Sequence, residues 1–175
     1  MNPLETEHHR PSVLCVDDDR DLAEVVQAVL TDEGYAVSCL YSVEGDALQR
    51  AVGRLEPDVI LLDSGSVTDY GSGWRDAAAI RRRDRPVPVV MFSAHRLDTR
   101  EAEEGTSARA VEAGFAAILP KPFELDDLLE AVATALGRST PFDRSAAGER
   151  HRTEALVKML RDRGATDIRP SKMRE

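Results

Sequence analysis

Long apolar segments are absent from this 175-residue sequence. No apolar run approaches the ~20 residues that a membrane-spanning helix needs, so no membrane association is expected. The polar first ten residues are also unlike a secretory signal peptide. We therefore expect a cytoplasmic protein.

Cysteine is scarce as well, with only Cys15 and Cys39, and each lies in an apolar stretch typical of a strand. Buried free thiols are a simpler interpretation of this pattern than a disulfide or a redox pair. None of the four histidines stands at a zinc-ligand spacing from either cysteine, which argues against a zinc site.

Basic residues are few before position 138. Residues 1–137 contain 13 Lys and Arg against 26 Asp and Glu, whereas residues 138–175 contain 10 against 6, for an overall net charge of −9. The acidic body is expected to repel nucleic acid, so DNA is an unlikely partner, while the basic tail can tolerate an acidic one.

The apolar pattern alternates between strand and helix five times. Strand-like runs cover residues 12–16, 35–40, 58–62, 87–92 and 115–119. Each is followed by apolar residues at helical spacing, as at Leu22, Val25 and Val29 before the stop at Gly34. Five such units predict an α/β fold, a doubly wound parallel sheet covered on both faces.

Four segments are expected along the chain. They are a flexible N-terminal arm (1–11), the α/β domain (12–137), a linker (138–148) and a C-terminal amphipathic helix with a polar tail (149–175). The apolar face of that last helix consists of Ala155, Leu156, Met159 and Leu160.

Charged and hydroxyl side chains follow four of the five strands. Asp17 and Asp18 come after the first, Asp63 after the third, Ser93 after the fourth and Lys121 after the fifth. The carboxyl ends of parallel strands share one edge of the sheet, where ligands bind. Crowded carboxylates repel one another, and Mg²⁺ relieves that repulsion. With a lysine and a hydroxyl, the set suits a phosphoryl group that a carboxylate can accept.

Each feature alone has an ordinary explanation. An acidic run after a strand is usually a solvated turn or a helix cap, as we expect for Asp19. A single Asp such as Asp63 is usually a loop residue, and Lys121-Pro122 usually begins a helix. Their occurrence together, in order and at successive strand ends, favours the phosphoryl site.

Four motifs make residues 11–137 resemble the receiver domains of response regulators in two-component signalling. They are VLCVDDD, PDVILLD, PVVMFSA and ILPKPF, each running into or through one of the strand ends above. The resemblance implies a flavodoxin-like sheet with strand order 2-1-3-4-5 and a receiver domain over residues 12–137.

The resemblance also implies a role at each matching position. Asp63 would be the phosphoacceptor, assisted by Ser93 and Lys121, and the Lys121–Pro122 peptide bond would be cis. Mg²⁺ would be held by a ligand set of Asp17, Asp18, Asp63 and the carbonyl of Gly65, with Asp18 the more direct ligand of the acidic pair. The phosphoryl donor would be a histidine kinase or a histidine phosphotransfer protein.

Three departures from the family pattern stand out. Ile118 occupies a position that is usually aromatic in the family and reports phosphorylation by rotating. The stretch from His95 to Ala108 is longer than in the family, as a loop extension or as a longer, frayed helix. His95 lies where the family tunes the lifetime of the phosphoryl group, although an ordinary loop histidine is the simpler interpretation.

We therefore expect a signalling phosphoacceptor, not an enzyme with an external substrate. No effector domain is recognisable, and the C-terminal helix suits a homodimer or an effector contact. The alternatives are a DNA-binding regulator using the basic C-terminal helix and a pseudo-receiver that switches without phosphorylation. A phosphatase with its nucleophile at Asp17 and an acid at Asp19 leaves Asp63 and Lys121 without a role.

Overall fold

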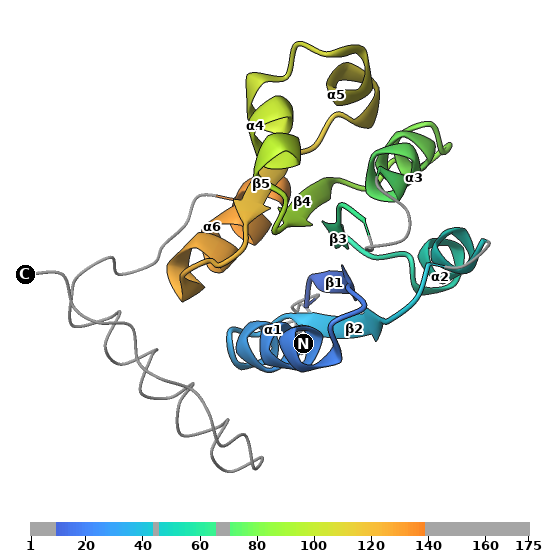
Figure 1. Cartoon of the computed structure of the whole chain (residues 1–175). Coiled ribbons are helices and arrows are strands. Elements are labelled where there is room, and N and C mark those ends of the chain that lie inside the picture. Colours follow the sequence, from blue (N-terminus) through green and yellow to red (C-terminus); the bar gives the residue numbers. More distant parts are fainter. Residues whose placement is uncertain (1–9, 44–45, 66–70, 139–175) are drawn as a thin grey trace, which may run out of the picture.

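The computed structural model describes residues 10–43, 46–65 and 71–138 (Figure 1). Three of the expected segments lie wholly or mostly outside these ranges: the N-terminal arm, the linker from residue 139 onward and the C-terminal helix. Within them, no helix is both long and apolar enough to cross a bilayer.

Five parallel strands form one sheet in the order β2-β1-β3-β4-β5, which confirms the predicted order. The strands are β1 (Ser12–Val16), β2 (Ala36–Leu40), β3 (Val59–Asp63), β4 (Val89–Ser93) and β5 (Ala117–Pro120). The direction of the crossovers reverses between β1 and β3. Side chains at the carboxyl ends of these two strands therefore border the crevice in which such sheets bind ligands.

Helices cover both faces of the sheet, as a doubly wound fold requires (Figure 1). One core contains the apolar stripes of α1 (Arg20–Asp32) and α6 (Leu125–Ala135). The other contains those of α2 (Ala47–Leu55), α3 (Ser72–Arg81) and α5 (Ala108–Ala113). Successive strand residues point to opposite cores: Val13 and Cys15 face the first, Leu14 and Val16 the second. This double burial explains why the central strands β1, β3 and β4 are almost entirely apolar, whereas the edge strand β2 is only partly buried and contains Ser38.

The long stretch after His95 forms two helices, α4 (Arg96–Glu104) and α5. Gly105 ends α4 in the left-handed conformation at φ 63°, and the Ser107 hydroxyl then caps α5 by accepting from the N–H of Ala110 at 3.2 Å. The extra residues are thus neither a loop extension nor one frayed helix, because a glycine stop and a serine start divide them.

Cys15 and Cys39 are neighbours in the register of β1 and β2, and both are free thiols. Cys15 is buried, whereas Cys39 is only partly buried because β2 is an edge strand. The prediction of free thiols is therefore confirmed, and that of full burial holds for Cys15 alone. The hydrogen bond with Cys39 and burial raise the pKa of the Cys15 thiol.

Candidate functional site

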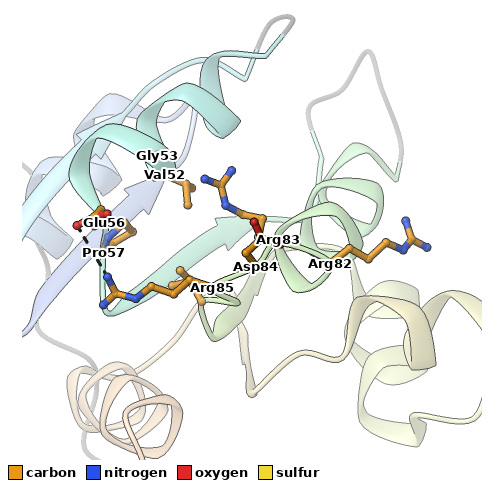
Figure 2. Close-up of a pocket in the computed structure, with 9 residues that line it drawn as sticks. Val52, Gly53, Glu56, Pro57, Arg82, Arg83, Asp84 and Arg85 are labelled. Carbon is orange, nitrogen blue, oxygen red and sulfur yellow. Dashed lines mark ion pairs between the residues drawn. The ribbon is translucent and has the colours of Figure 1, made fainter.

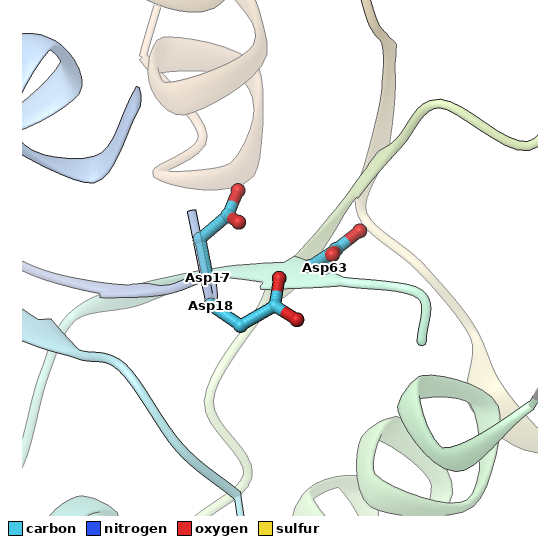
Figure 3. A group of neighbouring side chains, drawn as sticks. All are labelled: Asp17, Asp18 and Asp63. Carbon is cyan, nitrogen blue, oxygen red and sulfur yellow. The ribbon is translucent and has the colours of Figure 1, made fainter. Parts of the chain in front are cut away.

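The carboxyl edge of the sheet brings together the side chains that the strand-end pattern selected. Figure 3 shows the carboxylates of Asp17, Asp18 and Asp63 around a common space. One oxygen from each lies within 4.8 Å of the others. Lys121 reaches this group from the end of β5, and its Nζ lies 3.6 Å from Oδ1 of Asp63.

Asp17 is held on both sides of its carboxylate. Its side chain is fully buried, and the Nζ of Lys121 donates to its Oδ2 at 2.6 Å. The backbone N–H of Asp19 donates to its Oδ1 at 2.9 Å. Asp19 in turn caps α1 by accepting from the N–H of Leu22, as expected from the sequence. Asp18, by contrast, is exposed to solvent.

Asp63 has an unusual protonation equilibrium. Its pKa is raised to about 6, chiefly by burial and further by the nearby charges of Asp17 and Asp18. Lys121 and a hydrogen bond from the backbone of Ser64 oppose this rise. The carboxylate therefore remains mostly ionised at neutral pH, the form in which a carboxylate can act as a nucleophile.

The donor set fits a hard divalent cation. Three carboxylates at this spacing repel one another, which adds to the effect of burial on the pKa of Asp63, and a cation between them offsets that repulsion. Gly65 lines the same small cavity of about 40 Å³ as the three aspartates, which places its backbone beside them. Oxygen ligands of this kind, few in number and open to water, are those that Mg²⁺ prefers.

The hydroxyl of Ser93 is positioned by its neighbours. Ser93 is buried, and its Oγ shares a short hydrogen bond with the Oγ of Ser64. It also accepts from the backbone N–H of His95 at 2.9 Å. The imidazole of His95 itself lies toward α4, with Nδ1 3.6 Å from a carboxylate oxygen of Asp98.

Two residues at this edge were missed by the sequence reasoning. Ser64 is buried and bonded to Ser93, and Asp76 of α3 lines the cavity of the three aspartates. The position of Ser64 directly after Asp63 was the only signal for it. Asp76 had none, because its place depends on how α3 packs against β3.

The structure also shows the two features near the end of β5 that the sequence comparison with the family singled out, the Lys121–Pro122 bond and Ile118. The Lys121–Pro122 peptide bond is cis, as the resemblance implied. Ile118 is partly buried and packs against the core beneath α2, α3 and α5. An aliphatic side chain therefore occupies the position that the family usually gives to an aromatic ring.

Gly73 brings α3 into close contact with the peptide unit that joins Asp63 to Ser64. Its N–H donates to the carbonyl of Ser64 at 3.2 Å. A Cβ at Gly73 would lie 2.7 Å from the carbonyl oxygen of Asp63 and 2.7 Å from the Cα of Ser64. Contacts that short require the backbone to move.

We expect Gly73→Ala to lower the free energy of unfolding by about 1–3 kcal/mol, because the methyl group overpacks a backbone contact. Urea denaturation measures this loss. Gly53→Ala in α2 is the matched control, since its Cβ would only approach the flexible Arg83 side chain, at 3.4 Å. There alanine should stabilise the helix by about 0.5–1 kcal/mol. A Gly73→Ala protein as stable as wild type would disprove the close approach.

Comparisons with known proteins identify a family and agree with the fold. A family model described as the response regulator receiver domain matches residues 13–133. The DNA-binding response regulator MtrA of Mycolicibacterium paratuberculosis is 34% identical over 132 residues, covering 74% of this chain and 53% of MtrA. The nitrogen assimilation regulatory protein NtrX of Azorhizobium caulinodans is 32% identical over 124 residues, covering 71% of this chain and 26% of NtrX. The crystal structure of the NtrX receiver domain from Brucella abortus has 28% sequence identity and a TM-score of 0.58, covering 73% of this chain and 99% of that domain.

The matched region is only a part of these relatives. The chain covers about half the length of MtrA and about a quarter of NtrX. The expectation that DNA is an unlikely partner is not supported here, because MtrA is named a DNA-binding response regulator.

Proposed function

Because the chain belongs to the response regulator receiver family, we propose that it is a signalling protein that accepts a phosphoryl group on Asp63. The observation that carries this proposal is the convergence of a partly buried carboxylate with a lysine at one sheet edge. The ammonium of Lys121 lies 3.6 Å from Oδ1 of Asp63, and two further carboxylates lie beside them.

In the proposed transfer, a carboxylate oxygen of Asp63 attacks the phosphorus atom of the donor. The bond between phosphorus and the leaving atom breaks, and its electron pair stays with the leaving group. With acetyl phosphate that group is acetate; with a phosphohistidine it is imidazole, which takes up a proton. The product is an acyl phosphate on Asp63.

The surrounding side chains bind and orient the transferred group. Lys121 pairs with one phosphoryl oxygen, and the Ser93 hydroxyl donates to another once it leaves Ser64. The residues that would hold Mg²⁺ are Asp17, Asp18, Asp63 and the carbonyl of Gly65. A bound Mg²⁺ would neutralise charge on the phosphoryl oxygens and between the carboxylates.

The phosphoryl donor in this proposal is a histidine kinase or a histidine phosphotransfer protein. The family is a signalling family, and the chain promotes only its own phosphorylation and dephosphorylation. On phosphorylation the Ser93 hydroxyl would break its hydrogen bond with Ser64 and form one with the phosphoryl group. The segment between β4 and α4 would then lose one of the contacts that hold it in place. That local exchange is the start of a two-state switch, in which the aliphatic Ile118 leaves no aromatic ring to rotate.

A second candidate is a DNA-binding regulator, which the name of MtrA favours. The basic residues of the tail, outside the described ranges, are Arg150, Arg152, Lys158, Arg161 and Arg163. A single amphipathic helix more often serves docking to an effector or a second copy. Salt-dependent DNA binding by the full chain, compared with residues 1–137, separates these possibilities.

Intact-mass measurement after incubation with acetyl phosphate tests the phosphoacceptor proposal. With Mg²⁺ the protein should gain one phosphoryl group. With EDTA the reaction should be at least ~100-fold slower, because the cation contributes several kcal/mol of charge stabilisation. No gain by a folded sample with Mg²⁺ would reject the proposal in favour of a phosphorylation-independent pseudo-receiver.

A further inference from the structure

An apolar groove with a volume of about 530 Å³ lies between α1 and α6. Val29 and Leu128 in its lining are buried in the core beneath these two helices. The other apolar residues of the lining keep part of their surface in water: Leu22, Val25, Ala94, Pro122, Phe123 and Leu125. The groove therefore offers a partner exposed apolar surface, which the domain itself does not cover.

The two helices that border the groove are acidic. α1 contains three acidic residues and one arginine, and α6 contains three acidic residues and no basic one, for a combined formal charge of −5. Asp21 and Asp32 are exposed and lie one helical turn from Val25 and Val29, so negative charge borders the apolar surface. A second copy of this face would bring the same charges and would be repelled.

The cavity at the opposite edge of the sheet from Asp63 differs in both respects (Figure 2). It has a volume of about 410 Å³, and its apolar lining residues are buried. Figure 2 shows Arg82 directed away from it, where it pairs with Glu112 of α5 at 3.3 Å. Arg85 turns to Glu56 at the end of α2, at 3.8 Å. Both arginines have partners within the domain, so this cavity offers a ligand less than the groove does.

The chain contains a segment of the complementary kind. Residues 149–163, which the sequence predicts to be helical, have five Lys and Arg against three Asp and Glu, a formal charge of +2. One face of the predicted helix is apolar and consists of Ala155, Leu156, Met159 and Leu160. An apolar face flanked by basic residues suits an apolar groove flanked by acidic ones.

The chain also leaves the domain on the side of the groove. Arg138 hydrogen-bonds through its side chain to Tyr35, which is buried in the core beneath α1 and α6. Ten residues separate Arg138 from Glu149. Ten residues span up to about 33 Å, about twice the ~16 Å length of α6, so the segment can return along the groove.

We propose that residues 149–163 dock as a helix in the groove between α1 and α6 of their own chain, with Leu156 and Met159 against the apolar lining. A short linker gives the segment an effective concentration in the millimolar range. A contact too weak to hold two separate molecules together is therefore sufficient. While the segment is docked, its apolar face is not available to an effector or to a second copy.

Amide NMR of the ¹⁵N-labelled full chain tests this proposal. Leu156→Asp places a charge on the apolar face of the segment and should release it, which shifts the amides of Leu22, Val25, Phe123 and Leu125. Val157→Asp is the matched control, because it adds the same charge to the next residue, which lies on a different side of the helix. It should leave these four amides unchanged.

A synthetic peptide of residues 149–163 then tests the occupant directly. Added to the Leu156→Asp chain, it should shift the four groove amides back toward their wild-type positions. It should bind this variant about tenfold more tightly than wild type, because the wild-type segment competes at a millimolar effective concentration.

Four results would overturn the proposal. The first is an absence of groove shifts in Leu156→Asp, and the second is equal shifts in Val157→Asp, which would reduce the effect to charge. The third is a response at the exposed Leu97 and Val111 in place of the groove. The fourth is a wild-type mass that rises to a dimer in sedimentation together with groove shifts that depend on protein concentration, since the occupant would then come from a second copy.

Discussion

Asp63→Asn is expected to gain no phosphoryl mass under conditions in which wild type gains one group. The amide has no ionised oxygen to attack phosphorus, although it fills the same space beside Lys121. Intact mass after reaction with acetyl phosphate and Mg²⁺ measures the difference. Asp18→Asn serves as a comparison, because it removes a proposed metal ligand and should slow the gain without abolishing it.

The same Asp63→Asn substitution is expected to stabilise the metal-free fold at neutral pH. The folded pKa of Asp63, about 6, lies above the ordinary value of 3.8, so the folded state holds the charged form at a penalty. That penalty is full above pH 6 and disappears below the ordinary pKa. Wild type should therefore be less stable than the variant by up to about 3 kcal/mol at pH 7.5 and equal to it near pH 3.5.

Urea denaturation in EDTA at these two pH values checks the sign. Addition of Mg²⁺ should reduce the difference at pH 7.5, because the cation offsets the repulsion on Asp63 in wild type. If the Asp63→Asn variant still gained phosphoryl mass, the acceptor would have to be a different residue. A variant less stable than wild type at pH 7.5 would contradict the burial of the Asp63 charge.

Lys121→Met is expected to cause a large loss of stability in EDTA. It leaves the fully buried carboxylate of Asp17 without the ammonium that lies 2.6 Å from it. Breaking one side of a buried ion pair costs about 3–5 kcal/mol, and we expect the lower end because the N–H of Asp19 still bonds to Asp17. Urea denaturation measures the loss, and intact mass should show slower phosphoryl gain.

Two further variants separate the buried pair from a general charge effect. Asp17→Asn combined with Lys121→Met should recover most of the lost stability, because no unpaired buried charge remains. Arg100→Met removes a cation from an exposed pair with Glu104 at 2.9 Å and should cost less than about 1 kcal/mol. Similar losses for Lys121→Met and Arg100→Met would show that the Asp17 pair is solvated.

The α/β architecture and the main site residues could be predicted from the chain because both follow from local patterns. Apolar runs and helical spacing define the layers, and a residue directly after a parallel strand necessarily lies at the carboxyl edge. Asp17, Asp63, Ser93 and Lys121 were found by that rule. The sequence analysis did not predict that the stretch after His95 forms two helices. The signals for this division were present, because Gly105 ends α4 and Ser107 caps the start of α5.

The sequence by itself therefore determined the fold class, the sheet edge that carries the chemistry and the residues expected to carry it. Only the tertiary structure decided how neighbouring elements meet. The contact of Gly73 with the Asp63–Ser64 peptide depends on the approach of α3 to β3. The division of the arginines, with Arg82 toward α5 and Arg85 toward α2, depends on the packing on either side of one short segment. Local spacing sets the direction of a side chain along its own element, whereas the distance to another element is set by the packing of the whole core.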